Sequence, residues 1–176
     1  MKKNEVFTIG CVANFWEIKD QITLIKAVEV LTKKGIRVLL RLIGSGPTLE
    51  SCKSYVLKNN LVDSIVFEKE IKNEKLNQFF NEIDLFVLPS YYEALGCVYL
   101  ESWATNTPFI AIKEQGISEI IPKKYKEIML ASKSNVIELS SKISYFIENK
   151  VDIKFDVSYD IKNTISIFLK NKVFDD

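Results

Sequence analysis

The chain has 176 residues, and its 24 Lys and Arg side chains nearly balance its 23 Asp and Glu side chains, which leaves a formal net charge of +1. This length suits one domain with a single buried core. Near-neutral charge argues against a nucleic-acid partner, because such proteins usually carry a basic face. The sequence has no histidine, which excludes His-based nucleophilic and acid/base catalysis and His-ligated zinc within this chain.

The three cysteines, Cys11, Cys52 and Cys97, show no C-x-x-C spacing. The pattern predicts neither a disulfide framework nor a zinc site, and we expect buried, reduced thiols. Residues 1–5 are polar, and the apolar run 6–13 is too short to span a membrane. These features predict a soluble cytoplasmic protein.

Short apolar runs alternate with longer amphipathic segments along the whole chain. In chain order, the patterns predict a strand at 6–13, a helix at 20–34, a strand at 36–43, a helix at 47–59, a strand at 64–67, a helix capped by Asn73 that includes Phe79 and Phe80, a strand at 85–88, a helix at 97–105, strands at 109–112 and 127–130, a helix at 136–147, and a terminal helix at 161–169. Gly35 is expected as the residue that ends the first helix.

Strict alternation of apolar strands and helices predicts a parallel sheet that is buried on both faces. The expected fold class is α/β, a Rossmann-like doubly wound domain with a mainly parallel sheet of about six strands. Such sheets bind ligands outside the carboxyl ends of their strands. The loops of interest therefore follow Ala13, Ile43, Phe67, Leu88 and Ile112.

The segment from Pro89 to Glu101 carries two carboxylates, Glu93 and Glu101, on either side of a predicted helix start at Gly96. Backbone amides at the start of a helix favour an anion, and those of residues 95–98 would face it. A phosphate site beside two carboxylates suits a nucleotide sugar. For each residue alone an ordinary interpretation stays open: Glu93 as a solvated loop acid, and Glu101 as an acid that stabilises the helix dipole.

The sequence LPSYYEALGCVYLESWATNTPFIA, followed by EQGISEII, resembles the C-terminal, donor-binding domain of retaining glycosyltransferases of family 4. The family pattern falls on Pro89-Ser90, Glu93, Glu101, Pro108, and Gly116 with Glu119. IGCVANFWEIKDQITLIKA resembles the first unit of that domain, and IGSGP matches a recurrent Gly-x-Gly-Pro turn. The resemblance runs from about Phe7 to Glu148 and implies one half of a two-domain enzyme of the GT-B type.

The resemblance implies two catalytic residues, Glu93 beside the donor sugar and Lys19 on the donor pyrophosphate. It further implies a substrate-binding set in which Glu101 holds the ribose and Glu70 and Ile71 lie near the base; the set comprises Asn14, Gly44, Gly46, Glu70, Ile71, Leu95, Gly96, Cys97, Val98 and Glu101. No metal and no cofactor are expected. Retention in this family is pictured as front-face departure and attack, with the leaving phosphate as base, so the two glutamates are not a glycosidase acid/base pair.

Three positions depart from the family pattern. Asn14 stands where an arginine usually binds the pyrophosphate, which removes one cation. Asn106 replaces the usual glycine before Pro108, and asparagine tolerates the left-handed turn expected there. Lys69 replaces a glycine after the third strand, which weakens the prediction for base recognition.

We expect residues 1–176 to form a single donor-binding domain, with 155–176 as a C-terminal helical segment and the acceptor-binding N-terminal domain absent. The chain would then be truncated, or one subunit of a split enzyme. Expected partners are a nucleotide-sugar donor and, through the missing domain, an acceptor glycan or lipid-linked sugar. Nucleic acid is not expected, and the full protein would associate peripherally with the inner face of the cell membrane.

The sequence leaves two alternatives to this function. An NAD-dependent dehydrogenase needs G-x-G-x-x-G after its first strand, where this chain reads GCVANF (10–15). A non-catalytic nucleotide-sugar-binding or partner subunit on the same scaffold stays open, because Asn14 lacks the usual charge. Trp16 and Trp103 are interpreted as packing residues, with sugar platforms as the alternative.

Overall fold

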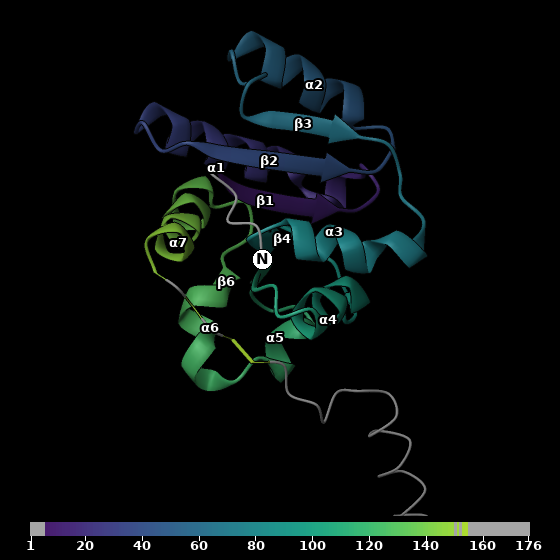
Figure 1. Cartoon of the computed structure of the whole chain (residues 1–176), viewed down its shortest axis with the longest axis vertical. Coiled ribbons are helices and arrows are strands. Elements are labelled where there is room, and N and C mark those ends of the chain that lie inside the picture. Colours follow the sequence, from purple (N-terminus) through teal and green to yellow (C-terminus); the bar gives the residue numbers. More distant parts are fainter. Residues whose placement is uncertain (1–5, 150, 152, 155–176) are drawn as a thin grey trace, which may run out of the picture.

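Six parallel strands form the central sheet of the computed structural model, which describes residues 6–149, 151, 153 and 154 (Figure 1). The strands are β1 (Phe7–Val12), β2 (Val38–Ile43), β3 (Ile65–Glu68), β4 (Leu85–Val87), β5 (Phe109–Ile112) and β6 (Leu130–Ala131). Their order is β3-β2-β1-β4-β5-β6, and every neighbouring pair is parallel. The predicted fold class is confirmed, and the strand order reverses between β1 and β4, where doubly wound sheets bind their ligands.

Helices cover both faces of this sheet. They are α1 (Gln21–Lys33), α2 (Leu49–Lys58), α3 (Leu76–Glu82), α4 (Cys97–Ala104), α5 (Ile117–Ile120), α6 (Lys123–Met129) and α7 (Val136–Glu148), with 3₁₀ turns η1 (Glu17–Lys19) and η2 (Asn73–Lys75). Right-handed crossovers place α1 and α2 on one face and the helices between β3 and β6 on the other. In agreement, α1 packs against α2 and α7, whereas α3 packs against α4.

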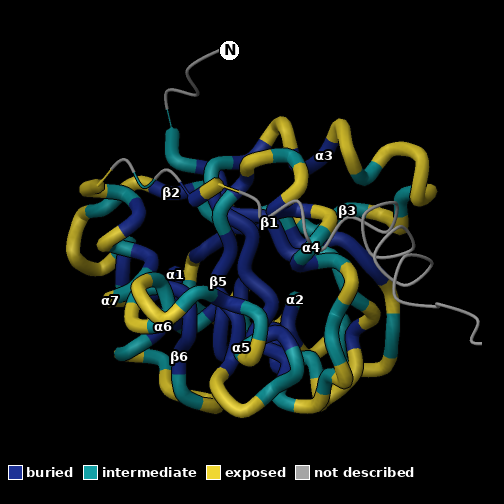
Figure 2. The backbone as a smooth tube through the Cα atoms, turned by 90° about the horizontal axis from the view of Figure 1, so that it is seen from below, coloured by how far each residue is buried: buried dark blue, intermediate teal, exposed yellow. Residues whose placement is uncertain are grey.

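The strands supply the buried centre of the molecule, and the exposed residues gather in the loops and on the outer helix surfaces (Figure 2). A chain of aromatic rings joins α3 and α4 to this centre, with successive ring centroids 5.1–5.9 Å apart; it runs Phe80, Phe86, Tyr99, Phe109 and Trp103. Such pairs contribute roughly 0.5–1.5 kcal/mol each beyond the burial of their area. Through Tyr99, the first turn of α4 is therefore packed against β4 and β5.

Several predicted boundaries are confirmed. The helix α1 ends at Lys33, and Gly35 follows with φ +78°, the left-handed conformation that ends helices. Asn106 has φ +60°, as expected for a residue that replaces glycine. Trp103 is fully buried and donates from Nε1 to the carbonyl of Ile153 at 3.1 Å, whereas Trp16 is 55% exposed and does not pack in the core.

Three predictions are wrong. Residues 127–129 belong to α6, and the strand β6 is only Leu130–Ala131; the side chains of Tyr125, Ile128 and Met129 face the core at helical spacing. Asn73 begins the turn η2 and does not cap α3, which starts at Leu76. Cys97 is exposed, because its position in the first turn of α4 points away from the sheet, although Cys11 and Cys52 are buried as expected.

The segments α5 and α6 were not predicted, since each is too short to show a full amphipathic period. The terminal helix predicted at 161–169 lies outside the described residues. Among the residues that the structure describes, no helix combines the length and the apolar character needed to cross a membrane.

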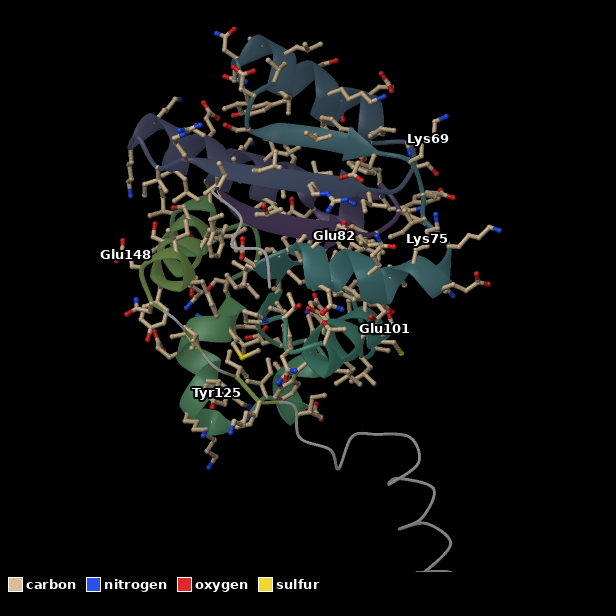
Figure 3. All side chains as sticks on the ribbon, viewed as in Figure 1. Lys69, Lys75, Glu82, Glu101, Tyr125 and Glu148 are labelled. Carbon is tan, nitrogen blue, oxygen red and sulfur yellow. The ribbon has the colours of Figure 1, made fainter. Side chains whose placement is uncertain are left out.

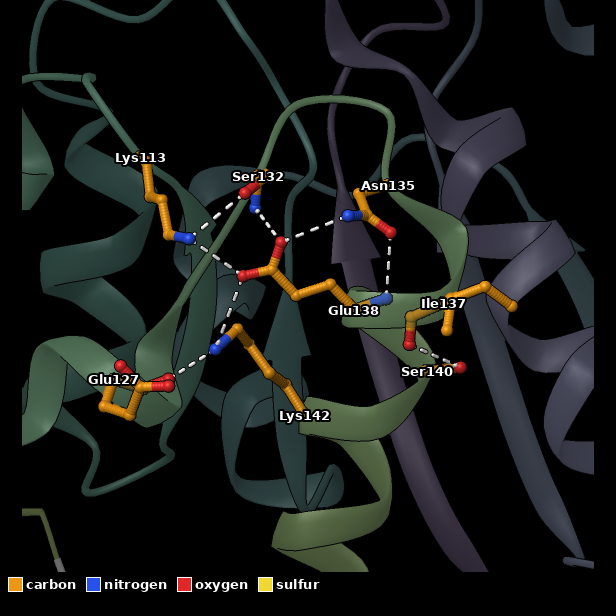
Figure 4. Close-up of polar contacts among 8 residues, drawn as sticks. All are labelled: Lys113, Glu127, Ser132, Asn135, Ile137, Glu138, Ser140 and Lys142. Atoms are coloured by element: carbon orange, nitrogen blue, oxygen red, sulfur yellow. Dashed lines mark hydrogen bonds and ion pairs between the residues drawn. The ribbon is translucent and has the colours of Figure 1, made fainter.

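A partly exposed network of hydrogen bonds joins the ends of β5 and β6 to the start of α7 (Figure 4). The Glu138 carboxylate accepts from the backbone amide of Ser132 at 2.9 Å and from Nζ of Lys113 at 2.9 Å. The Asn135 side chain accepts from the amide of Glu138 at 3.0 Å and so caps α7. Burial alone would raise the pKa of Glu138, but the contacts from Ser132 and Lys113 outweigh it and lower that pKa to about 2.

Candidate functional site

The centre of the candidate site is an ion pair between Lys19 and Glu93, which are 74 residues apart in the sequence. Lys19 ends the turn η1 after β1, and Glu93 lies in the loop after β4. The two side chains are only 21% and 15% exposed. The structure thus brings together the two residues predicted as catalytic, at the point where the strand order reverses.

Hydrogen bonds between loops explain why these side chains meet. The carbonyl of Ile18 accepts from the Ser90 hydroxyl at 3.1 Å and from the amide of Tyr91 at 3.0 Å. The buried Asp20, with φ +50°, accepts from the hydroxyls of Thr23 and Ser134, both at 2.8 Å. The turn that carries Lys19 is therefore held from the loops after β4 and β6.

The helix α4 begins at Cys97, directly after its N-cap residue Gly96, in agreement with the predicted helix start. Gly96 has φ +74°, and a Cβ at this position would lie 2.7 Å from the ring of Tyr99, so a side chain is excluded both by conformation and by space. The Tyr99 hydroxyl donates to the carbonyl of Leu88 at 2.8 Å, and burial raises the pKa of Tyr99 well above its ordinary value. Because first-turn amides have no acceptor within their own helix, α4 presents its positive end next to Glu93.

The neighbouring site predictions fall around this helix start. Leu95 and Val98 are half-buried, and Cys97 is exposed. Glu101 lies one turn further along α4 and is exposed. Figure 3 shows Glu101 at the same edge of the molecule as Lys69 and Lys75, the edge toward which the arrows of β1, β2 and β3 point. Glu101 is therefore at the carboxyl-end side of the sheet and is accessible there.

The glycine turn after β2 packs directly on the loop after β1. A Cβ at Gly44 would lie 2.1 Å from the carbonyl oxygen of Ala13, and one at Gly46 would lie 2.6 Å from that of Phe15. The amide of Phe15 donates to the carbonyl of Ser45 at 2.7 Å. Close packing of two loops thus accounts for both glycines in this structure.

Asn14 sits on the first loop, beside this contact. Asn14 is exposed, and its backbone carbonyl accepts a hydrogen bond from the side-chain Nε2 of Gln21 at 3.0 Å. An arginine at this position would have room to extend into solvent at the carboxyl ends of the strands.

The two residues predicted near a base lie in adjacent hollows. Glu70 is exposed, accepts from the Ser45 hydroxyl, and lines an open hollow of about 590 Å³ together with Gly44. Ile71 is half-buried and lines a smaller hollow of about 170 Å³ with Arg41 and Phe79. Glu70 therefore shares a hollow with the glycine turn, whereas Ile71 lines a different hollow.

Sequence reasoning missed the role of the loop after β5. The side-chain carbonyl of Gln115 accepts from the backbone amide of Glu93 at 2.8 Å. A Cβ at Gly116 would lie 1.6 Å from the carbonyl oxygen of Ala94, so Gly116 rests against the backbone of the Glu93 loop. Gly116 stood out in the sequence only as part of a Gly-x-x-Glu turn, and no local signal points to Gln115.

The two buried thiols, Cys11 and Cys52, have low reactivity. Burial raises the pKa of Cys11 to about 12 and that of Cys52 to about 11, so both are protonated at neutral pH and are poor nucleophiles. Within residues 6–149, 151, 153 and 154, no three His, Cys, Asp or Glu side chains come together in a way that could hold a metal ion.

A parallel sheet of this order, with a cation, a carboxylate and a helix N-terminus where the order reverses, defines a Rossmann-like α/β domain. The chain's residues 2–163 match the family of glycosyl transferases group 1, and the chain belongs to this family.

Relatives in this family are much longer than the chain. It is 34% identical over 102 residues to the putative glycosyltransferase EpsF of Bacillus subtilis, a match that covers 58% of this chain and 26% of EpsF. It is 27% identical over 168 residues to protein CapJ of Staphylococcus aureus, covering 93% of this chain and 41% of CapJ. The chain thus matches less than half the length of these relatives.

Solved structures show the same fold. Anabaena Alr3699/HepE in complex with UDP-glucose superposes with a TM-score of 0.78 at 20% identity, over 95% of this chain and 49% of that one. The C-terminal domain of the group 1 glycosyl transferase LpcC from Francisella tularensis superposes with a TM-score of 0.72 at 21% identity, over 95% and 87% of the two chains. The described fold is therefore that of a C-terminal domain of a GT-B type glycosyltransferase.

Proposed function

We propose that this chain is the donor-binding half of a retaining glycosyltransferase of family 4, which transfers a glycosyl group from a nucleoside-diphosphate sugar to an acceptor in polysaccharide or glycan biosynthesis. The observation that carries the proposal is the half-buried Lys19–Glu93 pair beside the N-terminus of α4, where the strand order reverses. Family membership and the UDP-glucose complex of a structural neighbour support it.

In this proposal Lys19 binds the donor pyrophosphate. An ammonium group has three N–H donors, so Lys19 can keep its contact with Glu93 and still donate to a phosphate oxygen. The amides of Gly96 and Cys97 supply further positive potential at the same point. Together they stabilise the negative charge that develops on the leaving nucleoside diphosphate, and the proposed reaction needs no metal or cofactor.

Glu93 lies beside the donor sugar, and Glu101 accepts hydrogen bonds from the ribose hydroxyls. Glu70, Ile71 and the glycine turn border the base. Retention follows from departure and attack on one face of the sugar, with the leaving phosphate taking the acceptor's proton. Glu93 is the catalytic carboxylate beside the donor sugar, Glu101 binds the ribose, and the two do not form an acid/base pair.

The acceptor half lies in another part of the full protein, as the greater length of the relatives suggests. Residues 1–176 act as one donor-binding domain, and the acceptor is a glycan or a lipid-linked sugar. The full protein works in the cytoplasm, at the inner face of the cell membrane, without nucleic acid. The domain alone binds donor weakly and transfers nothing, because no second domain closes the cleft and excludes water.

The second candidate, a non-catalytic nucleotide-sugar-binding subunit, draws support from Asn14, which is neutral and exposed at the edge of the pyrophosphate site. In that case the donor would bind but would not be consumed by the full protein with its acceptor.

Titration calorimetry with UDP, GDP, UDP-glucose and GDP-mannose tests the proposal. At least one pair of nucleotide and nucleotide sugar should bind the wild-type chain, and Lys19→Met should weaken that binding by about tenfold. Lys33→Met is the matched control, because Lys33 lies at the far end of α1 and pairs with Glu29. Failure of all four ligands to bind, or equal losses in both variants, would overturn the proposed site.

A further inference from the structure

The backbone of Glu93 forms two hydrogen bonds with the loop after β5. The amide of Glu93 donates to the side-chain carbonyl of Gln115 at 2.8 Å, and the carbonyl of Glu93 receives a longer bond from the amide of Gly116 at 3.4 Å. Both backbone groups of Glu93 are therefore directed at one dipeptide that lies 22 residues further along the chain.

The dipeptide is itself fixed in place. The Ser118 hydroxyl donates to the carbonyl of Gln115 at 2.6 Å, and Gly116 lies against Ala94 with no room for a side chain. Gln115 is half-buried, which limits access of water to its contact with Glu93. The backbone that carries this acceptor is thus fixed, and the side-chain nitrogen of Gln115 donates to the carbonyl of Lys113 at 3.4 Å.

We propose that Gln115 is a positioning residue, whose side-chain carbonyl holds the backbone of Glu93 and thereby keeps the Glu93 carboxylate against Lys19. Glu93 is the third residue of the loop after Pro89-Ser90 and lies outside any helix or strand. A loop residue without ladder partners keeps its orientation only through contacts of this kind. Ser90, on the same loop as Glu93, holds the turn of Lys19, and Gln115 holds Glu93 from the loop after β5, so both ends of the ion pair are attached to the Glu93 loop.

The consequence for ligand binding rests on the proposed function, in which Glu93 meets the donor sugar. Loss of Gln115 would let the carboxylate drift away from the sugar while Lys19 stays near the pyrophosphate. The effect should therefore be larger for a nucleotide sugar than for the nucleoside diphosphate alone.

The first measurement needs no ligand. Amide hydrogen exchange at Glu93, followed by NMR, should be about fivefold faster in Gln115→Met, which keeps the side-chain length but removes the acceptor. Gln115→Glu restores an acceptor oxygen and should restore protection at high salt, where its added charge is screened. Ser118→Ala disturbs the same turn but leaves the acceptor, and should stay within about twofold of wild type.

The second measurement uses UDP-glucose and GDP-mannose, whichever the wild type binds, with UDP or GDP as reference. Gln115→Met should lower the affinity for the nucleotide sugar by about fivefold and that for the nucleoside diphosphate by less than about twofold. In a Glu93→Ala background, Gln115→Met should not lower the affinity further, because Gln115 acts on the ligand only by positioning the Glu93 carboxylate.

The outcomes separate the two proposals. Unchanged exchange at Glu93 in Gln115→Met, or an equal change in Ser118→Ala, would overturn the role of Gln115. Additive losses in the double variant would do the same. If the wild type binds none of these ligands, the proposed function fails, whereas exchange at Glu93 still decides whether Gln115 positions it.

Discussion

Substitution of Gly116 by alanine should disturb the candidate site, because it adds a methyl group against the backbone of the Glu93 loop. Gly116 has φ −52° and ψ −37°, a conformation that alanine adopts without strain. The added Cβ would lie 1.6 Å from the carbonyl oxygen of Ala94 and 2.7 Å from its carbonyl carbon. The substitution therefore destabilises the protein only through a steric clash, and the clash is with Ala94, the residue next to Glu93.

The magnitude follows from this geometry. Real Cβ atoms stay at least 3.0 Å from other heavy atoms, so the separation must nearly double. Neither side of the contact is a flexible side-chain end, and one of the two backbones has to move. Overpacking of this kind costs about 1–3 kcal/mol, which corresponds to about 5- to 150-fold in affinity when the cost falls on the conformation that binds the ligand. We expect the affinity for a nucleotide sugar to fall by about 10- to 100-fold.

Calorimetry with UDP-glucose and GDP-mannose, paired with urea unfolding, measures both effects. Gly35→Ala is the matched control, because its Cβ would meet nothing within 4 Å although φ is +78°. It should cost about 1–2 kcal/mol of stability through the left-handed conformation alone and leave ligand affinity unchanged. If Gly116→Ala binds the ligand like wild type, or if both variants lose affinity equally, the contact between Gly116 and the Glu93 loop does not support the site.

Three further predictions concern charged and polar side chains. The pKa of Glu138 is lowered from 4.5 to about 2, so its ionised form stabilises the fold above pH 4.5, and this stabilisation is lost as the pH falls toward 2. Because the carboxylate is partly exposed, the free energy of unfolding of the wild type should fall by about 1–2 kcal/mol over this range relative to that of Glu138→Gln, as measured by acid-induced unfolding. Glu101→Ala should weaken nucleoside-diphosphate binding by at least about tenfold but leave pyrophosphate binding nearly unchanged by calorimetry, and equal losses would assign Glu101 a structural role. Asn14→Arg should tighten nucleoside-diphosphate binding by about fivefold at low salt, with a smaller gain at high salt; a gain indifferent to salt would show that Asn14 does not face the phosphates.

The local pattern was sufficient for most of the fold. Buried strands such as β1 and β2 are mainly apolar runs, and α1 carries a regular apolar stripe that ends shortly before Gly35. The pattern failed where elements are short. The run Lys123–Met129 makes fewer than two helical turns, and its apolar residues next to the two-residue strand β6 look like a strand when only the sequence is seen.

The sequence also predicted which loops carry the candidate site. Glycines and paired carboxylates between a strand and a helix can be recognised within a single segment of the chain. Gly96 shows the agreement most clearly: the sequence predicts a helix start there, and the structure requires glycine by both φ and space. Gly44 and Gly46 show the limit of such reasoning. Their close neighbour in the structure is the loop of Ala13 and Phe15, which the turn itself does not reveal.

What the amino-acid sequence determined by itself was the alternation of elements, the parallel sheet and the loops that hold Lys19, Glu93 and Glu101, because propensity, burial period and helix-start chemistry act within a few residues. Only the tertiary structure decided that Lys19 meets Glu93, that Ser90 holds the turn of Lys19, and that Gln115 holds the backbone of Glu93. These contacts join segments 74, 72 and 22 residues apart. Their geometry depends on the order in which β1, β4 and β5 lie side by side, and no local pattern specifies the distance between two loop ends.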